Sequence, residues 1–156
     1  MVKIRICRLG KQDSRGIQAL LREVWPTAHE YPDEWRRKRT LNHIEIEKEM
    51  DSGYQYFGIR IRGKIVGLYK ASVREDGCFG EHQSIHPDYR GRGLAKLMYE
   101  QFFRFARRNN CKRVYVNILA NQLATRKFVE SLGFKKKGPE YEQFKGMLVQ
   151  MYEKRV

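Results

Sequence analysis

Residues 85–95 read I-H-P-D-Y-R-G-R-G-L-A, and they join an apolar-leaning run to a long amphipathic helix through a glycine-rich turn. Gly91 and Gly93 carry no side chain, so the backbone there can approach a ligand closely and adopt conformations that a Cβ forbids. Because the unpaired amides and the dipole of a helix N-terminus favour an anion, this turn is suited to hold a pyrophosphate, and Arg90 and Arg92 add positive charge. The apolar residues that follow recur at helical spacing: Leu94, Leu97, Met98, Phe102, Phe105 and Ala106.

A second block follows after about one helix and one strand. It reads N-x-x-A-x-x-x-F-x-x-x-x-G-F over residues 121–134, a short helix pattern that ends in Gly-Phe. A glycine turn is by itself a weak signal, because glycines also form ordinary turns. The two blocks in this order, with R-x-x-G-x-A over residues 90–95, resemble the two recurrent motifs of the GNAT-type N-acetyltransferase superfamily.

Length and composition indicate one domain over residues 1–156, with 41% hydrophobic and 32% charged residues. No apolar run approaches the roughly 20 residues that span a bilayer, so we expect no membrane partner. The N-terminus lacks the apolar core of a signal peptide. Cys7, Cys78 and Cys111 show no C-x-x-C spacing, so we expect neither a disulfide framework nor a metal site, and a cytoplasmic location.

The formal net charge of +14 is the strongest anomaly of the composition. Such a field attracts polyanions, which raises nucleic-acid binding as an alternative function. The densest basic groups lie in different expected elements, at residues 35–39, 104–108 and 135–137. We therefore assign most of them to solvated faces and expect no nucleic-acid partner, although the charge leaves one open.

Periodicity and turn residues divide the chain into alternating elements. We expect strands over residues 4–9, 54–61, 64–73, 79–85 and 113–119, one from Phe134, and one around 147–152. We expect one helix that is capped by Asp13 and ends before Pro26, and a second that contains Leu41, Ile44 and Met50. A third begins at Leu94, and a fourth covers residues 123–132. The aromatic, proline-rich residues 25–35 are expected to form a loop over a pocket.

A strand, a helix and a strand in succession imply a parallel crossover, so the fold class is α/β, with a mixed α+β sheet flanked by helices. The element order resembles the GNAT fold over essentially the whole chain. The resemblance implies a central sheet of about six to seven strands with about four helices. It also implies that the strands over 79–85 and 113–119 are parallel and splay apart.

The resemblance further implies how acetyl-CoA, the acyl donor, is held, without a metal. Its pantetheine arm enters the gap between the splayed strands, where backbone groups near Ser84 and Ile85 bond it like an added strand. Asn121 helps to hold the arm or, alternatively, only caps the next helix. Phe128 is a core or pantetheine-packing residue. The pyrophosphate rests on the amides of Arg90, Gly91, Arg92, Gly93, Leu94 and Ala95.

The reaction implied is acetyl transfer by direct attack of a neutral amine on the thioester. Primary ammonium groups have pKa values of about 10, so a base or a water chain should remove a proton. Glu81 is the candidate base, because the family often places an acidic residue there and the strand period puts Glu81 on one face with Gln83 and Ile85. Alternatively, Glu81 is a solvated or ion-paired carboxylate.

Phe128 departs from the family pattern, because many members carry at this position a tyrosine that can protonate the departing sulfur. A phenylalanine cannot donate a proton, so a water or another tyrosine would have to replace it. Tyr115, Tyr141 and Tyr152 are candidates, and none is preferred. Alternatively, the sulfur leaves as a thiolate while a strand amide polarises the carbonyl.

The acceptor is expected to be a primary amine of a small molecule or peptide, and no motif identifies it. Acidic residues within 30–34 would attract a cation, whereas the arginines of 36–39 would prefer a carboxylate or phosphate. Two other functions stay open, a non-catalytic CoA-binding module, which Phe128 favours, and a basic nucleic-acid-binding domain. A homodimer is also left open.

Overall fold

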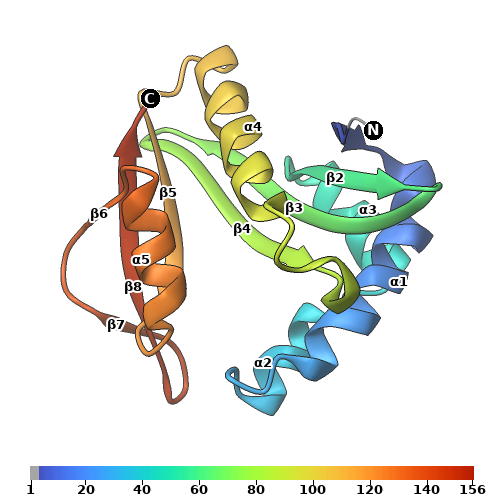
Figure 1. The fold of residues 1–156 in the computed structure, drawn as a ribbon, viewed down its shortest axis with the longest axis horizontal. Helices are drawn as coiled ribbons and strands as arrows, with labels where there is room; N and C mark the ends of the chain where they lie inside the picture. Colours follow the sequence, from blue (N-terminus) through green and yellow to red (C-terminus); the bar gives the residue numbers. More distant parts are fainter. Residues whose placement is uncertain (1–3) are drawn as a thin grey trace.

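Within the described residues, eight strands form one sheet in the order β1-β2-β3-β4-β5-β8-β6, with β7 paired to β8 (Figure 1). The computed structural model describes residues 4–156, apart from the side chain of His82. Neighbouring strands are antiparallel except β4 and β5, which are parallel, so the expected mixed sheet is confirmed, with short strands raising the number. The strands are β1 (Ile6–Leu9), β2 (Gln55–Ile61), β3 (Lys64–Arg74), β4 (Gly77–Ile85), β5 (Arg113–Leu119), β6 (Lys135–Lys136), β7 (Tyr141–Phe144) and β8 (Met147–Arg155).

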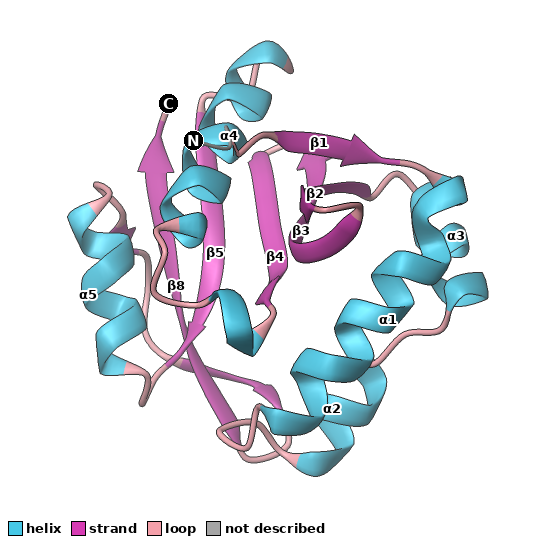
Figure 2. Cartoon of the chain, turned by 45° about the vertical axis from the view of Figure 1, so that its right-hand side comes forward, coloured by secondary structure: helices cyan, strands magenta, loops and turns pink. Residues whose placement is uncertain are grey.

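Helices cover both faces of this sheet (Figure 2). The helices are α1 (Ser14–Val24), α2 (Asp33–Arg39), α3 (His43–Asp51), α4 (Leu94–Arg108) and α5 (Leu123–Ser131). The side chains of α1 and α3 pack against one face, and those of α4 and α5 against the other. No helix in the described chain is both long and apolar enough to cross a membrane.

The second expected helix is in fact two helices. α2 ends at Arg39, and α3 begins after Asn42, whose side chain accepts a hydrogen bond from the Glu45 amide at 2.9 Å. The Glu45 carboxylate accepts one from the Asn42 amide in return, and this capping box starts a new helix. Residues 25–35 are only partly a loop, because a 3₁₀ turn covers Trp25–Thr27 and α2 begins at Asp33.

β4 and β5 pair only at their first residues. Cys78 pairs with Val114 and Phe79 with Tyr115, although the strands are nine and seven residues long. Beyond Phe79 the two strands diverge (Figure 1). The expected parallel, splayed pair is confirmed, and β4 turns one edge of its backbone toward a gap.

β4 also contains one residue more than the stretch of β3 opposite it. Leu68 pairs with Ser84 and Lys70 with Glu81, so two steps along β3 match three along β4. A bulge of this kind reverses the alternation of side chains beyond it. Ile85 accordingly packs into the cluster beneath α4. The expectation that Glu81 and Ile85 share one face is therefore wrong, because it assumed an unbroken two-residue period.

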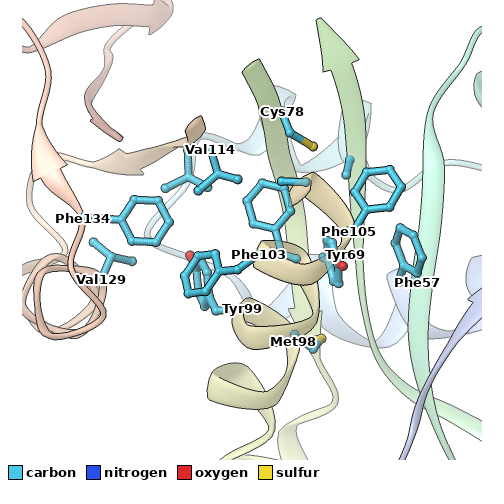
Figure 3. Packing of buried hydrophobic residues seen from close by; sticks show 14 of the residues in the cluster. Phe57, Tyr69, Cys78, Met98, Tyr99, Phe103, Phe105, Val114, Val129 and Phe134 are labelled. Atoms are coloured by element: carbon cyan, nitrogen blue, oxygen red, sulfur yellow. The ribbon is translucent and has the colours of Figure 1, made fainter. Parts of the chain in front are cut away.

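Aromatic side chains of α4 connect the two halves of the splayed sheet (Figure 3). One group of rings reaches β2 and β3, and another reaches the segment after α5. Because the hydrogen-bonded contact between β4 and β5 is short, this shared burial holds the halves together. The ring pairs are Phe105–Phe57 at 5.0 Å, Phe102–Tyr69 at 5.7 Å, Tyr99–Phe134 at 5.6 Å and Phe103–Phe134 at 5.7 Å between centroids.

Gly80 of β4 allows α4 to lie close to the sheet. A Cβ at Gly80 would lie 2.7 Å from the ring of Phe102, which is buried. We expect Gly80→Ala to lower the free energy of unfolding by about 1–3 kcal/mol, because the ring must move within a packed core. The control is Gly67→Ala on β3, where the nearest atom would be 3.5 Å away. Equal losses in chemical denaturation of the two variants would contradict this account.

Candidate active site

A cavity of about 320 Å³ occupies the gap between β4 and β5. Its walls come from both strands, from α4, from the start of α5 and from residues 24–31. The expected loop segment therefore does lie over a cavity. Within the described residues, no group of three or more His, Cys, Asp or Glu side chains is placed to hold a metal ion.

The glycine-rich turn leads from β4 into α4 beside this cavity. Gly91 and Gly93 are both left-handed, with φ of 75° and 77°, a conformation that favours glycine. Gly93 is the N-cap residue of α4 and has no side chain to bond the first amides of the helix. The amides of Leu94 and Ala95 can therefore bond an anion, and the dipole of the 15-residue helix favours one.

The structure brings three of the expected ligand-binding residues to the cavity wall: Ser84, Ile85 and Arg90. The Arg90 guanidinium donates to the Ile85 carbonyl at 3.2 Å, which holds the turn against the end of β4. Arg92 donates to the Asp88 carbonyl at 3.2 Å and is exposed. Both charges therefore stand at the turn, where the helix amides begin.

Asn121 and Phe128 lie outside this lining, as do residues 91–95 of the turn beside it. Asn121 is exposed in the turn after β5, and the N-cap of α5 is Gln122, so the alternative that Asn121 caps this helix is wrong. Gln122 is the residue that lines the cavity, and its amide donates to the Glu30 carboxylate at 3.2 Å. Phe128 packs against the ring of Tyr99 at 5.9 Å, and Tyr99 is the one that lines the cavity.

A second, smaller cavity of about 70 Å³ adjoins the first. Residues of α2, β4, β5, β7 and β8 line it. Molecules bound in the two cavities would contact each other beside the residues that line both. These shared residues are Trp25, Tyr31, Glu81 and Asn117.

The Glu81 carboxylate at this junction is flanked by two cations. One oxygen lies 4.0 Å from the Lys70 ammonium, and the other accepts a hydrogen bond from Arg39 at 3.4 Å. The Glu81 side chain is 14% exposed. The expected alternative of an ion-paired carboxylate is thus confirmed, and the same carboxylate lines both cavities.

Among the buried residues of the described chain, Lys70 is the one with a charged side chain, which is 1% exposed. Its ammonium lies 2.8 and 2.9 Å from the two oxygens of Glu49, and the Tyr56 hydroxyl also donates to Glu49. Burial, and after it the Glu49 carboxylate, raises the pKa of Tyr56. Lys70 is therefore neutralised chiefly by Glu49, which leaves Glu81 for Arg39 and for the cavities.

The tyrosines suggested by the sequence as proton donors do not line the cavity. The Tyr115 hydroxyl donates to Asp76 at 3.2 Å, the Tyr152 hydroxyl donates to Glu130 at 2.9 Å, and Tyr141 is exposed on β7. Three other tyrosines do line it: Tyr31, Tyr69 and Tyr99.

Among these three, Tyr31 lines both cavities. The Tyr69 hydroxyl already donates to Gln101. Burial, followed by the Glu30 carboxylate, raises the pKa of Tyr31 to about 12, so its hydroxyl keeps its proton at neutral pH.

Sequence reasoning missed Asn117 as a site residue, and it included Tyr31 and Arg39 only within the ranges 25–35 and 36–39 without singling them out. The Asn117 Oδ1 is buried and has no hydrogen-bond partner within the described chain. The sequence feature that could have identified Asn117 is a single amide side chain within the apolar run of β5, where a buried polar side chain needs a hydrogen-bond partner. Tyr31 and Arg39 carried no such signal, because each stands among other aromatic or basic residues.

Known proteins resemble this chain in sequence and in fold. A model of the Acetyltransferase (GNAT) family matches residues 16–134. An N-acetylaspartate synthetase from Xenopus tropicalis is 31% identical over 117 residues, which cover 67% of this chain and 43% of that protein. One from Danio rerio is 35% identical over 97 residues, covering 61% and 34%. The chain thus spans less than half the length of these curated relatives.

Solved structures share the fold at low sequence identity. The PaiA N-acetyltransferase from Thermoplasma acidophilum, in complex with coenzyme A, has a TM-score of 0.81 at 14% identity, covering 99% of this chain and 100% of that one. An acetyltransferase of the GNAT family from Streptococcus pneumoniae has a TM-score of 0.79 at 16% identity, with 99% of each chain covered.

Gly93 offers a test of the anion site. A valine there would be held at a φ of 77°, which costs about 1–2 kcal/mol, so we expect the turn to shift and the affinity for coenzyme A to fall about tenfold. Gly138→Val is the matched control, since Gly138 has a φ of 70°, open space around it and a place in the loop before β7. Calorimetric titration with coenzyme A at moderate salt measures both, and an equal affinity for the two variants would contradict the assignment.

Proposed function

This chain belongs to the Acetyltransferase (GNAT) family, and from that premise we propose that it moves an acetyl group from acetyl-CoA to a primary amine of a small molecule or peptide. The observation that carries the proposal is the pair of adjoining cavities with a carboxylate at their junction. One cavity lies beside a helix N-terminus suited to an anion, and the other is lined by α2 and the β7–β8 hairpin.

The larger cavity suits the coenzyme. The pyrophosphate would bond the amides of Leu94 and Ala95 beside Arg90, while Gly91 and Gly93 leave room for it. The pantetheine arm would extend along the β5-facing edge of β4, whose backbone groups near Ser84 and Ile85 lie at the gap. This path would bring the thioester to the junction with the smaller cavity.

The chemistry then needs one new bond. The amine nitrogen attacks the acetyl carbonyl carbon, the carbon–sulfur bond breaks, and coenzyme A leaves with the sulfur electron pair. The proton that the nitrogen loses on becoming an amide ends on this sulfur, which gives the free thiol. Glu81 would take the proton that the ammonium must lose before attack, and the Asn117 amide oxygen could accept a hydrogen bond from the same amine. The Tyr31 hydroxyl would donate a hydrogen bond to the sulfur or the developing oxyanion, a task that Phe128 cannot perform.

The acceptor within this proposal is a small amine, and the relatives suggest where to begin. Two of them are named N-acetylaspartate synthetase, so L-aspartate is the first acceptor to assay. We also propose that residues 1–156 act as one catalytic domain in the cytoplasm, which the three free cysteines support, and that the domain can form a homodimer.

Glu81→Gln tests the base. We expect kcat to fall about 10²–10⁴-fold, because the glutamine cannot take a proton, while the affinity for acetyl-CoA stays unchanged. The measurement is thiol release from acetyl-CoA, with calorimetry for binding. Glu153→Gln is the control, because Glu153 is also a partly buried carboxylate paired with an arginine, Arg113 at 2.5 Å, but it lines neither cavity. A Glu81→Gln variant that turns over like the wild type would exclude Glu81 as the base.

Tyr31→Phe tests the hydrogen-bond donor. We expect kcat to fall about 10–100-fold with the coenzyme affinity preserved, because one donor to the reacting atoms is lost. Since burial raises the pKa of Tyr31 to about 12, the hydroxyl is protonated throughout the range from about pH 6 to 9, so the pH profile should drop without changing shape. Tyr69→Phe serves as the control, because its hydroxyl is already bonded to Gln101. A changed profile would assign Tyr31 a titrating role instead.

A further inference from the structure

We infer that the smaller cavity recognises the acceptor as an α-amino acid, with Arg39 binding the carboxylate next to the amine that Glu81 deprotonates. This inference rests on the proposed function and names its substrate class. Among the residues that line this cavity, Arg39 and Glu81 are the charged side chains, and their nearest atoms are 3.4 Å apart.

Arg39 is held in position but has donors to spare. Its guanidinium stacks over the ring of Trp35 at 4.2 Å, and Trp35 packs against Phe144 of β7 at 5.5 Å. The guanidinium carries five N–H donors, and within the described chain its one hydrogen-bond partner is Glu81, at a long 3.4 Å. A carboxylate could therefore take the remaining donors in the bidentate geometry that arginine favours.

The adjacent charges of this pair match the adjacent charges of an amino-acid zwitterion. In an α-amino acid the ammonium and the carboxylate are attached to one carbon, so both can face Glu81 and Arg39 together. Lys70 lies behind Glu81, at 4.0 Å, but it is paired chiefly with Glu49, so the two cations and two carboxylates balance and suit an acceptor that brings one charge of each sign. Asn117, whose buried amide oxygen has no hydrogen-bond partner within the described chain, lines the same junction.

Other amines fit this arrangement less well. A polyamine or a lysine side chain has no carboxylate beside its amine, so Arg39 would face it as an uncompensated positive charge. The cavity is also small, at about 70 Å³. Its size suits the amine and the carboxylate of one amino acid, which are the groups that the inference places there.

The test compares each of a panel of L-amino acids, starting with L-aspartate, with its α-carboxamide, which keeps the amine and shape but lacks the negative charge. We expect the wild type to prefer the best amino acid over its amide by about 10–100-fold in kcat/KM, as for a charge-assisted hydrogen bond. Arg39→Gln should remove this preference by raising KM for the amino acid, and Arg39→Lys should restore part of it.

Lys38→Gln is the matched control, since it removes one positive charge from the same helix, where Lys38 lies over Phe144 and does not line the cavity. It should keep the wild-type preference. The inference is overturned if the wild type uses amino acids and amides equally, or if Arg39→Gln lowers both by the same factor.

A second measurement separates this inference from the proposed reaction. Calorimetry follows the binding of the same amino acids to the protein loaded with coenzyme A. Binding that Arg39→Gln abolishes, without any thiol release in the assay, would support the inference and refute acetyl transfer. Thiol release from amines without any carboxylate preference would support acetyl transfer and refute the inference.

Discussion

The aromatic face of α4 is the interaction on which the rest of the structure depends. β4 and β5 share two residue pairs, so main-chain hydrogen bonds contribute little to joining the halves of the described sheet. Rings of α4 pack instead against β2 and β3 on one side and against Phe134 on the other. This burial allows the strands to separate without opening the core, and Gly80 provides the close approach that it needs.

The separation of the strands creates the site. The bulge in β4 shifts Ser84 and Ile85 relative to Glu81, and the absence of a paired strand along this edge leaves backbone groups toward the larger cavity. The same helix that joins the sheet halves begins at the glycine turn, so its N-terminus lies beside that cavity. One element thus supplies both the packing that maintains the gap and the amides suited to an anion.

Charge is organised around the junction of the cavities rather than spread evenly through the core. Lys70 is buried against Glu49, and Glu81 lies between Lys70 and Arg39. A buried ammonium without a carboxylate partner would be costly, so Glu49 and Tyr56 are part of the support for this cluster. The outcome is a carboxylate at a junction lined mainly by aromatic and amide side chains, where a cationic amine and a carboxylate can be recognised together.

The sequence by itself determined the order of the elements, the left-handed glycine turn and, through two motifs, the family, because these depend on local backbone preferences and short spacings. The break between α2 and α3 was not predicted from the sequence, although Asn42 and Glu45 have the spacing of a capping box. Only the tertiary structure decided the bulge in β4, the exposure of Asn121 and the pairing of Glu81 with Arg39, 42 residues apart in the chain. These features depend on strand register and on the packing of separate elements across the gap, and no local pattern encodes the distance between two such side chains.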